Sequence, residues 1–199
     1  MLVSEVREEL CLDFANTRSW RGSETPTERL NDVADLLRWV KRTGGVDAQA
    51  VRPIETWSRE RPDDAGALLA QAVAMRETIY RIFSAVAAGE PSEERDFAAL
   101  KRAIAAAPAR AELGRSGGRY GWRIDDLRPS AAHLLAPVLW SAGDLLLDAD
   151  RRRIRRCANE DCLWLFLDES KSGTRRWCDM ASCGNRAKAR RHYAKVKRR

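Results

Sequence analysis

Residues 157–193 read CANEDCLWLFLDESKSGTRRWCDMASCGNRAKARRHY, and they decide how the whole chain is interpreted. The stretch holds four of the five cysteines of the chain, in two C-x4-C pairs that are separated by fifteen residues. A structural zinc site needs four thiolate or imidazole ligands in a tetrahedron, and two short loops supply them with little loss of chain entropy. The spacing therefore predicts one structural Zn²⁺ ion held by Cys157, Cys162, Cys178 and Cys183. Since these ligands leave no open position for water, a catalytic zinc is not expected.

The segment between the two cysteine pairs fits this interpretation. Trp164 and Phe166 alternate with leucines, and a polar, turn-rich stretch follows at 168–173. We predict a β-hairpin or an extended loop that joins two knuckles. A module of about 40 residues buries too little apolar surface to fold alone, and a metal ion supplies the missing stability. The alternative is that the cysteines are unrelated buried or redox-active residues.

The charge of the chain is strongly asymmetric. Residues 151–199 hold 16 Lys and Arg against 5 Asp and Glu, a formal charge of +11, which leaves −4 on residues 1–150 of a net +7. A basic block joined to a mildly acidic body is typical of a tail that binds a polyanion such as DNA. The sequence shows neither a signal peptide nor a long apolar window, so we expect a cytoplasmic protein without a membrane span. In a reducing compartment, paired cysteines favour a metal over a disulfide.

The residues after the last cysteine predict a basic helix. Gly184 and Asn185 suit a turn into a helix, and the cations that follow would surround most of it. Such a helix suits phosphate contacts or entry into a major groove. The predicted nucleic-acid contacts, including two arginines before the second knuckle, are Arg175, Arg176, Arg186, Lys188, Arg190, Arg191, Lys195 and Lys197. The alternatives are a solvated basic end, an acidic protein partner and, for Arg176, an ion pair with Asp168.

Residues 1–150 carry the periodicities of a mostly helical domain. Thr25-Pro26-Thr27-Glu28 has the composition of a capping box, which predicts a helix from there to Gly44-Gly45. Apolar residues at helical spacing continue along the chain. Further helices are predicted over 47–60, from Asp63 to Gly89, from a Ser92 cap to the residue before Pro108, and from Ser130 onward with a kink at Pro137.

Two segments break this helical pattern. The LCLDF stretch at 10–14 alternates, which predicts a short strand or a tight buried element in which Cys11 is a small buried residue. Glycines between 113 and 124 exclude a helix there, and the alternation that follows them predicts a β-hairpin turning at Gly117-Gly118. No Gly/Ser linker follows residue 150, so the zinc module is expected close to the end of the last body helix.

The predicted fold class is therefore mainly α with a small β element. An α+β body spans 1–150. A small four-cysteine zinc module of the treble-clef or knuckle-like kind spans 151–199 and ends in a basic helix.

A polar cluster early in the body is a candidate small-molecule pocket. It comprises Asn16, Thr17, Arg18 and Trp20, and its alternative interpretation is a capped, hydrogen-bonded loop. An acidic helical body fused to a nucleic-acid-binding module suggests a domain that senses an effector or forms a homodimer. The sequence has no nucleophile–His–acid set and no phosphate-binding loop, so we do not expect an enzyme.

The C-terminal motifs resemble the CGNR zinc-finger family, named for Cys183-Gly184-Asn185-Arg186. The resemblance spans Cys-x4-Cys-x-Trp-x-Phe-x-Asp-x-Ser-Lys and Arg-Arg-Trp-Cys-x-Met-x-x-Cys-Gly-Asn-Arg-x-Lys. The body is similar to the ABATE domain that accompanies this finger, in LCLDFANT, in the helix ending in LLRWV and in the segment around Trp122. The resemblance implies a bacterial, stress-related, DNA-binding transcription regulator. An adaptor whose zinc module binds protein or RNA without a specific DNA site is the alternative.

Overall fold

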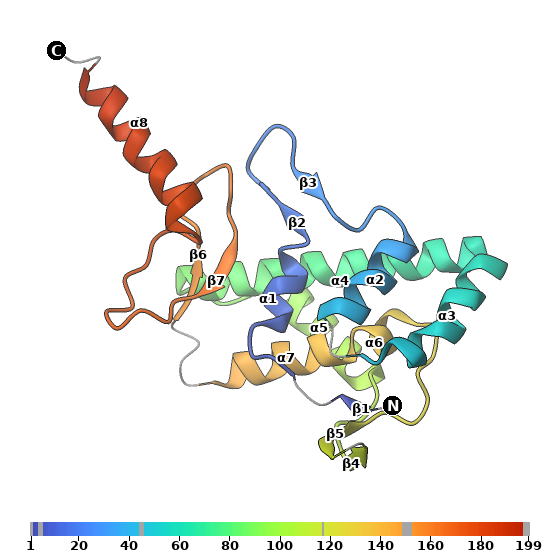
Figure 1. Cartoon of the computed structure of the whole chain (residues 1–199). Helices are drawn as coiled ribbons and strands as arrows, with labels where there is room; N and C mark the ends of the chain where they lie inside the picture. The colour runs from blue at the N-terminus through green and yellow to red at the C-terminus, as the bar shows by residue number, and fades with distance from the viewer. Residues whose placement is uncertain (1, 4–5, 44–45, 117, 149–152, 197–199) are drawn as a thin grey trace.

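The computed structural model describes residues 2–3, 6–43, 46–116, 118–148 and 153–196. Helices dominate residues up to 148, here called the body, and residues 153–196 form the finger (Figure 1). The body helices are α1 (Leu10–Ala15), α2 (Val33–Thr43), α3 (Ala48–Glu60), α4 (Pro62–Ala88), α5 (Glu94–Ala106), α6 (Ala131–Leu134) and α7 (Ala136–Leu147). The mainly helical fold class is confirmed.

Short antiparallel strand pairs complete the fold. In the body, β1 (Leu2–Val3), β5 (Arg119–Arg123) and β4 (Leu113–Ser116) form one sheet, and β2 (Arg18–Ser19) pairs with β3 (Thr27–Glu28). In the finger, β6 (Ile154–Arg156) pairs with β7 (Leu165–Leu167), and a π-helical turn η2 (Met180–Gly184) leads into α8 (Asn185–Val196). The β4–β5 register, Leu113 opposite Trp122, confirms the predicted hairpin, although Gly117 lies outside the described residues.

Helix α4 is the central element of the body and confirms the predicted long helix. Pro62 at its first turn fits a position without an amide partner, and Gly89 ends it with a left-handed φ of 77°. One face buries Leu68, Ile79 and Phe83. The helix contacts α1, α2, α3, α5 and α6, and both strands of the finger (Figure 1).

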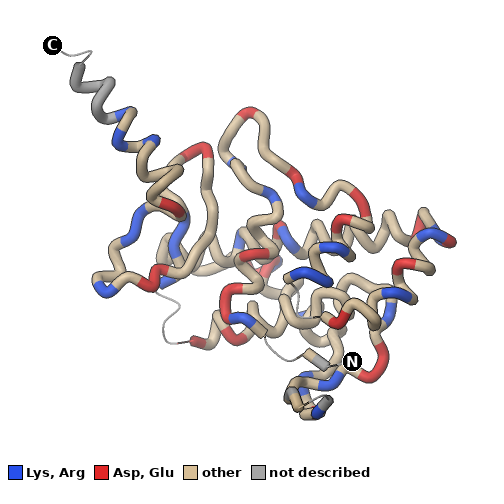
Figure 2. The backbone as a smooth tube through the Cα atoms, in the orientation of Figure 1, with Lys and Arg blue, Asp and Glu red and all other residues tan. Residues whose placement is uncertain are grey.

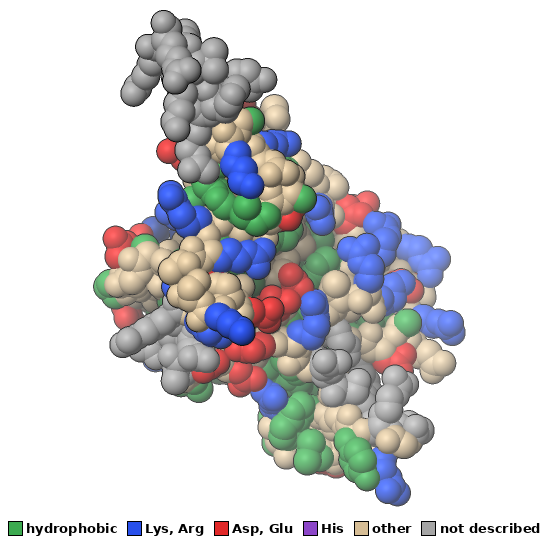
Figure 3. Space-filling view, turned by 60° about the vertical axis from the view of Figure 1, so that its left-hand side comes forward, with side chains coloured by type: hydrophobic (Ala, Val, Ile, Leu, Met, Phe, Trp, Pro, Cys, Tyr) green, Lys and Arg blue, Asp and Glu red, His purple; other side chains and the backbone are tan. Residues whose placement is uncertain are grey.

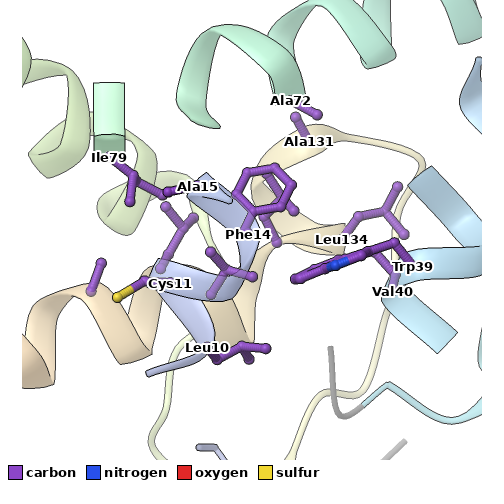
Figure 4. Close-up of a cluster of buried hydrophobic side chains, with 14 of the residues drawn as sticks. Leu10, Cys11, Phe14, Ala15, Trp39, Val40, Ala72, Ile79, Ala131 and Leu134 are labelled. Carbon is purple, nitrogen blue, oxygen red and sulfur yellow. The ribbon is translucent and has the colours of Figure 1, made fainter. Parts of the chain in front are cut away.

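The LCLDF segment forms a helix and not the predicted strand. The other prediction for this segment, a tight buried element, is confirmed. Leu10, Cys11, Leu12, Phe14 and Ala15 are all buried in α1. Figure 4 shows Phe14 from α1 among Trp39, Ile79 and other apolar side chains of neighbouring helices. A helix buried nearly all round places apolar residues at most positions, so its sequence carries no reliable period. Burial also raises the pKa of Cys11 to about 12, which confirms it as an inert, small core residue.

The predicted helix start at Thr25–Glu28 is also wrong. Thr27 and Glu28 lie in β3, and α2 begins at Val33, after Asp32 accepts a hydrogen bond from the Asp35 amide at 2.7 Å. The Glu28 carboxylate forms a bidentate ion pair with Arg76 at 2.5 and 2.7 Å. It also accepts from the amides of Arg29 and Leu30, which follow it in the chain, both at 2.9 Å. The apolar stripe of α2 is nevertheless buried as expected, while Gly44 and Gly45 lie outside the described residues.

Two predicted caps have different outcomes. Ser92 does not cap α5, because the capping position falls on Glu93, whose side chain makes no capping bond. Ser130 does cap α6, since its hydroxyl accepts a hydrogen bond from the His133 amide at 3.3 Å. The kink expected at Pro137 is a break, in which α6 ends at Leu134 and α7 starts at Ala136.

The strand pair of the finger is built into the core of the body. Ile154 and Leu165 belong to the same buried cluster as α1, α4 and α7. The Asn16 carboxamide donates to the Leu165 carbonyl at 2.8 Å and accepts from the Leu165 amide at 3.1 Å, so it pairs with β7 as a strand would. Tyr80 of α4 donates its hydroxyl to the Leu163 carbonyl at 2.9 Å. The finger therefore packs on α4 and α1.

Candidate metal centre and nucleic-acid interface

The structure brings the four predicted cysteine ligands into one cluster. Their sulfur atoms all lie within 4.8 Å of one another, and Cys157, Cys162 and Cys183 are buried while Cys178 is half-buried. The Sγ–Sγ distances are 3.7 Å for Cys162–Cys178 and 3.8 Å for Cys178–Cys183. A tetrahedron with Zn–S bonds of about 2.3 Å places its sulfur atoms about 3.8 Å apart. All four are free cysteines, so both the donor set and the spacing fit a zinc ion.

Local turns fix the two cysteine pairs. In the first pair, the Asn159 carbonyl accepts from the amides of Cys162 and Leu163, at 2.9 and 3.1 Å. In the second, the Asp179 carboxylate accepts from the amides of Ala181 and Ser182, and these bonds lower the pKa of Asp179. The rings of Trp20, Trp164 and Trp177 pack against the cluster, with Phe166 buried among the sulfur atoms.

The loop between the pairs is organised by Asp168, which is buried. Its carboxylate accepts from the Ser170 hydroxyl at 2.5 Å, the Ser170 amide at 3.0 Å and the Arg175 amide at 2.8 Å, and these bonds lower its pKa. The alternative in which Arg176 pairs with Asp168 is not what the structure shows. The Arg176 guanidinium instead lies 5.5 Å from the centre of the Trp177 ring.

The predicted nucleic-acid residues lie on the loop before Cys178 and on α8, which projects away from the body (Figure 2). Arg175 folds back onto the second knuckle, donating to the carbonyls of Trp177 and Cys178. Arg186 is exposed, and its guanidinium lies 4.6 Å from the centre of the Trp20 ring of the body. Lys188 is exposed on the same helix. Arg191 and Lys195 lie on the later turns of α8, while Lys197 lies outside the described residues.

Arg190 has partners within the finger. Its Nη2 donates to Asn159 Oδ1 at 2.8 Å and lies 3.6 Å from the Asp161 carboxylate. Together with Arg176 it borders a pocket of about 430 Å³ between the first knuckle and α8. The residues lining this pocket are Ala158, Asn159, Glu160, Arg176, Trp177, Ala187 and Arg190. Figure 3 shows several basic side chains scattered over the face of the molecule that it presents.

The candidate small-molecule residues of the body lie in different surroundings. Asn16 is bonded to β7, and Thr17 donates to the Phe14 carbonyl at 2.7 Å and contacts Arg76. Arg18 lies in β2, partly exposed. Trp20 lines a different pocket, of about 310 Å³, which borders the metal site, since Cys162, Cys178 and Cys183 also line it.

Three features of the finger and of its contact with the β2–β3 hairpin, here called the seam, escaped the sequence analysis. Trp20 has a φ of 53°, a conformation that costs a bulky residue on the order of 1–3 kcal/mol. Gly22 donates its amide to the Asp161 carbonyl at 3.2 Å, and a Cβ atom there would lie only 1.8 Å from the Glu160 carbonyl oxygen. The third is Asn159, an amide within the first C-x4-C loop. In the sequence, only its position between the ligands Cys157 and Cys162 could have indicated a role near the metal.

A helical body with a four-cysteine centre and an attached basic helix defines a zinc-finger protein. Comparison with protein families agrees: residues 8–149 match ABATE, described as "putative stress-induced transcription regulator", and residues 153–196 match the CGNR zinc finger. The chain belongs to the ABATE family and carries a C-terminal CGNR zinc finger. Both families are described in terms of regulation or metal binding and not as enzymes. Comparison with curated proteins gave no match. In the described part of the chain, no helix has the length and apolar character to cross a bilayer.

Proposed function

We propose that the protein is a transcription regulator that binds duplex DNA through α8 and the loop before Cys178. The observation that carries the proposal is the direct continuation of the cysteine cluster into a basic helix. Cys183 lies in η2, α8 starts two residues later at Asn185, and the helix contains no acidic residue. A helix fixed at one end and free of acidic side chains is suited to phosphate contacts along a groove.

The four cysteines would hold one structural Zn²⁺ ion, which supplies binding energy that folds the finger rather than a reactive group. Their thiolates fill the tetrahedron, so the ion would have no site for water. The role of the metal is then to fix where α8 begins and in which direction it points. This agrees with the small number of buried apolar side chains around the cluster.

The pocket between the first knuckle and α8 supports a phosphate contact. Arg176 and Arg190 border it from opposite elements, and the Trp177 ring forms part of its wall. Two arginines that border one pocket suit a phosphate group, because a guanidinium can donate two parallel hydrogen bonds to it. Such contacts would position the finger on DNA, whereas base recognition would fall to residues further along α8.

The body would regulate the finger through the β2–β3 hairpin. Trp20 contacts Arg186, and Gly22 contacts Asp161. Trp20 also lines the 310 Å³ pocket, together with Ser19 and Arg29 of the hairpin region. A small-molecule effector in this pocket would touch the hairpin and the knuckle together and so could shift α8. Homodimerisation of the body stays a prediction of the sequence.

Selection from random duplex DNA by the full-length protein tests the proposal. We expect one enriched motif, and a log affinity that falls with log salt by about 0.9 per neutralised phosphate. Lys188→Gln and Arg176→Gln should each weaken binding and reduce the salt slope by about 1. Arg52→Gln, which removes the same charge from the exposed side of α3, is the matched control.

The adaptor alternative predicts a different result. If no duplex motif is enriched while RNA or a protein partner is retained, the DNA-binding proposal fails. It also fails if removal of residues 184–199 leaves duplex binding unchanged.

A further inference from the structure

Asn159 connects the two cysteine pairs through its side chain. It lies between Cys157 and Cys162, is only 3% exposed, and its Nδ2 lies 3.4 Å from the Sγ atom of Cys183 in the second pair. A buried amide is costly unless both of its ends are paired. Here the other end is paired as well, because Oδ1 accepts from Arg190 Nη2 at 2.8 Å.

These contacts fix the orientation of the amide. If the group were reversed, Oδ1 would face an electron-rich sulfur, and Nδ2 would face the donors of a guanidinium, which accepts no hydrogen bond. The Asp161 amide adds a further donor to Oδ1, at 3.4 Å. The network therefore admits one orientation, with the N–H group directed at Cys183.

We infer that Asn159 is a hydrogen-bond donor to the metal-bound thiolate of Cys183, and that Arg190 of α8 is the positioning residue that holds it there. Four thiolates around Zn²⁺ carry a formal charge of −2, so an N–H···S bond draws charge from the sulfur and stabilises the bound metal. Partners of metal ligands that orient or polarise them typically change metal affinity by about 10–100-fold.

The contact of Arg190 with Asn159 was not predicted from the sequence, which indicated only a basic residue on a helix. It projects from α8, downstream of the last cysteine, and reaches back to the first knuckle. Its contact at 3.6 Å with Asp161 restrains the guanidinium from the same side. One side chain thus links α8 to the sulfur environment of the metal, independently of any nucleic acid.

Three variants of the full-length protein separate this role from a simple charge effect. Asn159→Asp replaces the donor with a carboxylate, and we expect about 10–100-fold weaker zinc binding in competition with a chelator. Arg190→Gln removes the positioning group and should weaken zinc binding by a smaller factor. Lys188→Gln removes one positive charge from the same helix without touching Asn159 and should leave zinc affinity within about twofold of the original protein.

Replacement of zinc by Co²⁺ gives an absorption spectrum that a change in folding alone would not shift. Loss of the N–H···S bond raises the energy of the sulfur lone pairs, so the sulfur-to-cobalt absorption should move to longer wavelength in the Asn159 and Arg190 variants. Because a buried aspartate can itself unfold the finger, Asn159→Ala repeats the measurement without added charge and without any side-chain donor. The inference is overturned if Asn159→Ala keeps the original zinc affinity and cobalt spectrum. It is equally overturned if Arg190→Gln and Lys188→Gln weaken zinc binding to the same extent.

Discussion

In the body, large apolar side chains converge on α1 and α4. In the finger, one buried phenylalanine and two tryptophans, joined by Trp20 of the body, surround four sulfur atoms. The boundary between these two kinds of core does not follow the change in sequence composition. Strands β6 and β7 belong to the finger by sequence, yet Ile154 and Leu165 are buried in the core of the body. The finger therefore has two parts. One is a strand pair held by the body, and the other is a metal-dependent part that carries α8.

The largest expected effect comes from removing the metal. Cys178→Ser, or treatment with a chelator, removes a binding free energy on the order of 10–16 kcal/mol for such sites. We expect the amides of α8 to lose protection from hydrogen exchange, while the Leu165 amide, bonded to Asn16, stays protected. If Leu165 loses protection together with α8, the finger is a single metal-dependent unit and the proposed division is wrong.

The second-largest effect is expected in the stability of the body, without a change in the finger. Arg76 is 1% exposed and pairs with both Glu28 and Glu77. Arg76→Met therefore leaves Glu28 without its cation, and leaves Glu77 with Arg21 alone, at 2.6 Å. We expect a loss of about 3 kcal/mol in the free energy of unfolding, near the lower end for a broken buried pair because both carboxylates are partly hydrated. Denaturant unfolding measures it, and Arg52→Met on the exposed side of α3 is the control. Zinc affinity should not change, and a parallel loss of zinc would contradict the comparison.

A smaller effect is expected at the seam. In Gly22→Ala the new methyl group would meet the Glu160 carbonyl oxygen at 1.8 Å, so the hairpin must move off the knuckle. We expect about 1–3 kcal/mol of destabilisation, typical of overpacking. Gly66→Ala, at an exposed position of α4 with no atom near its Cβ, should instead stabilise by up to about 1 kcal/mol. Equal effects of the two changes would show that the seam is not tightly packed.

Elements with local causes were predictable from the sequence. The spacing of apolar residues and Gly89 define α4, alternation and glycines define β4–β5, and the cysteine pairs define the metal cluster. Each of these signals lies within the segment that it shapes.

The β2–β3 hairpin and its surroundings could not be predicted in this way, because their partners lie far along the chain. The Glu28 carboxylate pairs with Arg76, 48 residues away, and the Asn16 amide pairs with Leu165, 149 residues away. A local capping pattern such as Thr25–Glu28 is overridden when a buried arginine requires the same carboxylate. The hydrogen bond from Asn159 to Cys183 is another such case, since only folding brings the two knuckles together.

The smallest expected effect is the pH dependence of the stability that the Glu28 carboxylate contributes. Burial raises the pKa of Glu28, but the hydrogen bonds from Arg76 and from the Leu30 and Arg29 amides, together with the charge of Arg76, outweigh it, so the pKa lies below its ordinary value of 4.5. A carboxyl group with a lowered folded-state pKa stabilises the protein fully above the ordinary value, and this contribution is lost as the pH falls through the lower value. Glu28→Gln should therefore destabilise the body at pH 7, by less than Arg76→Met, and the difference from the original protein should shrink below about pH 4.

Unfolding of both proteins is followed from pH 7 to pH 3. Protonation of the thiolates releases zinc from both proteins at low pH, so that loss cancels in the difference between them. Glu24→Gln, at an exposed position between the same two strands, supplies the background. A difference that stays constant from pH 7 to pH 3 would mean that Glu28 stabilises the hairpin by packing. The ion pair with Arg76 would then not be what holds the hairpin in place beside the finger.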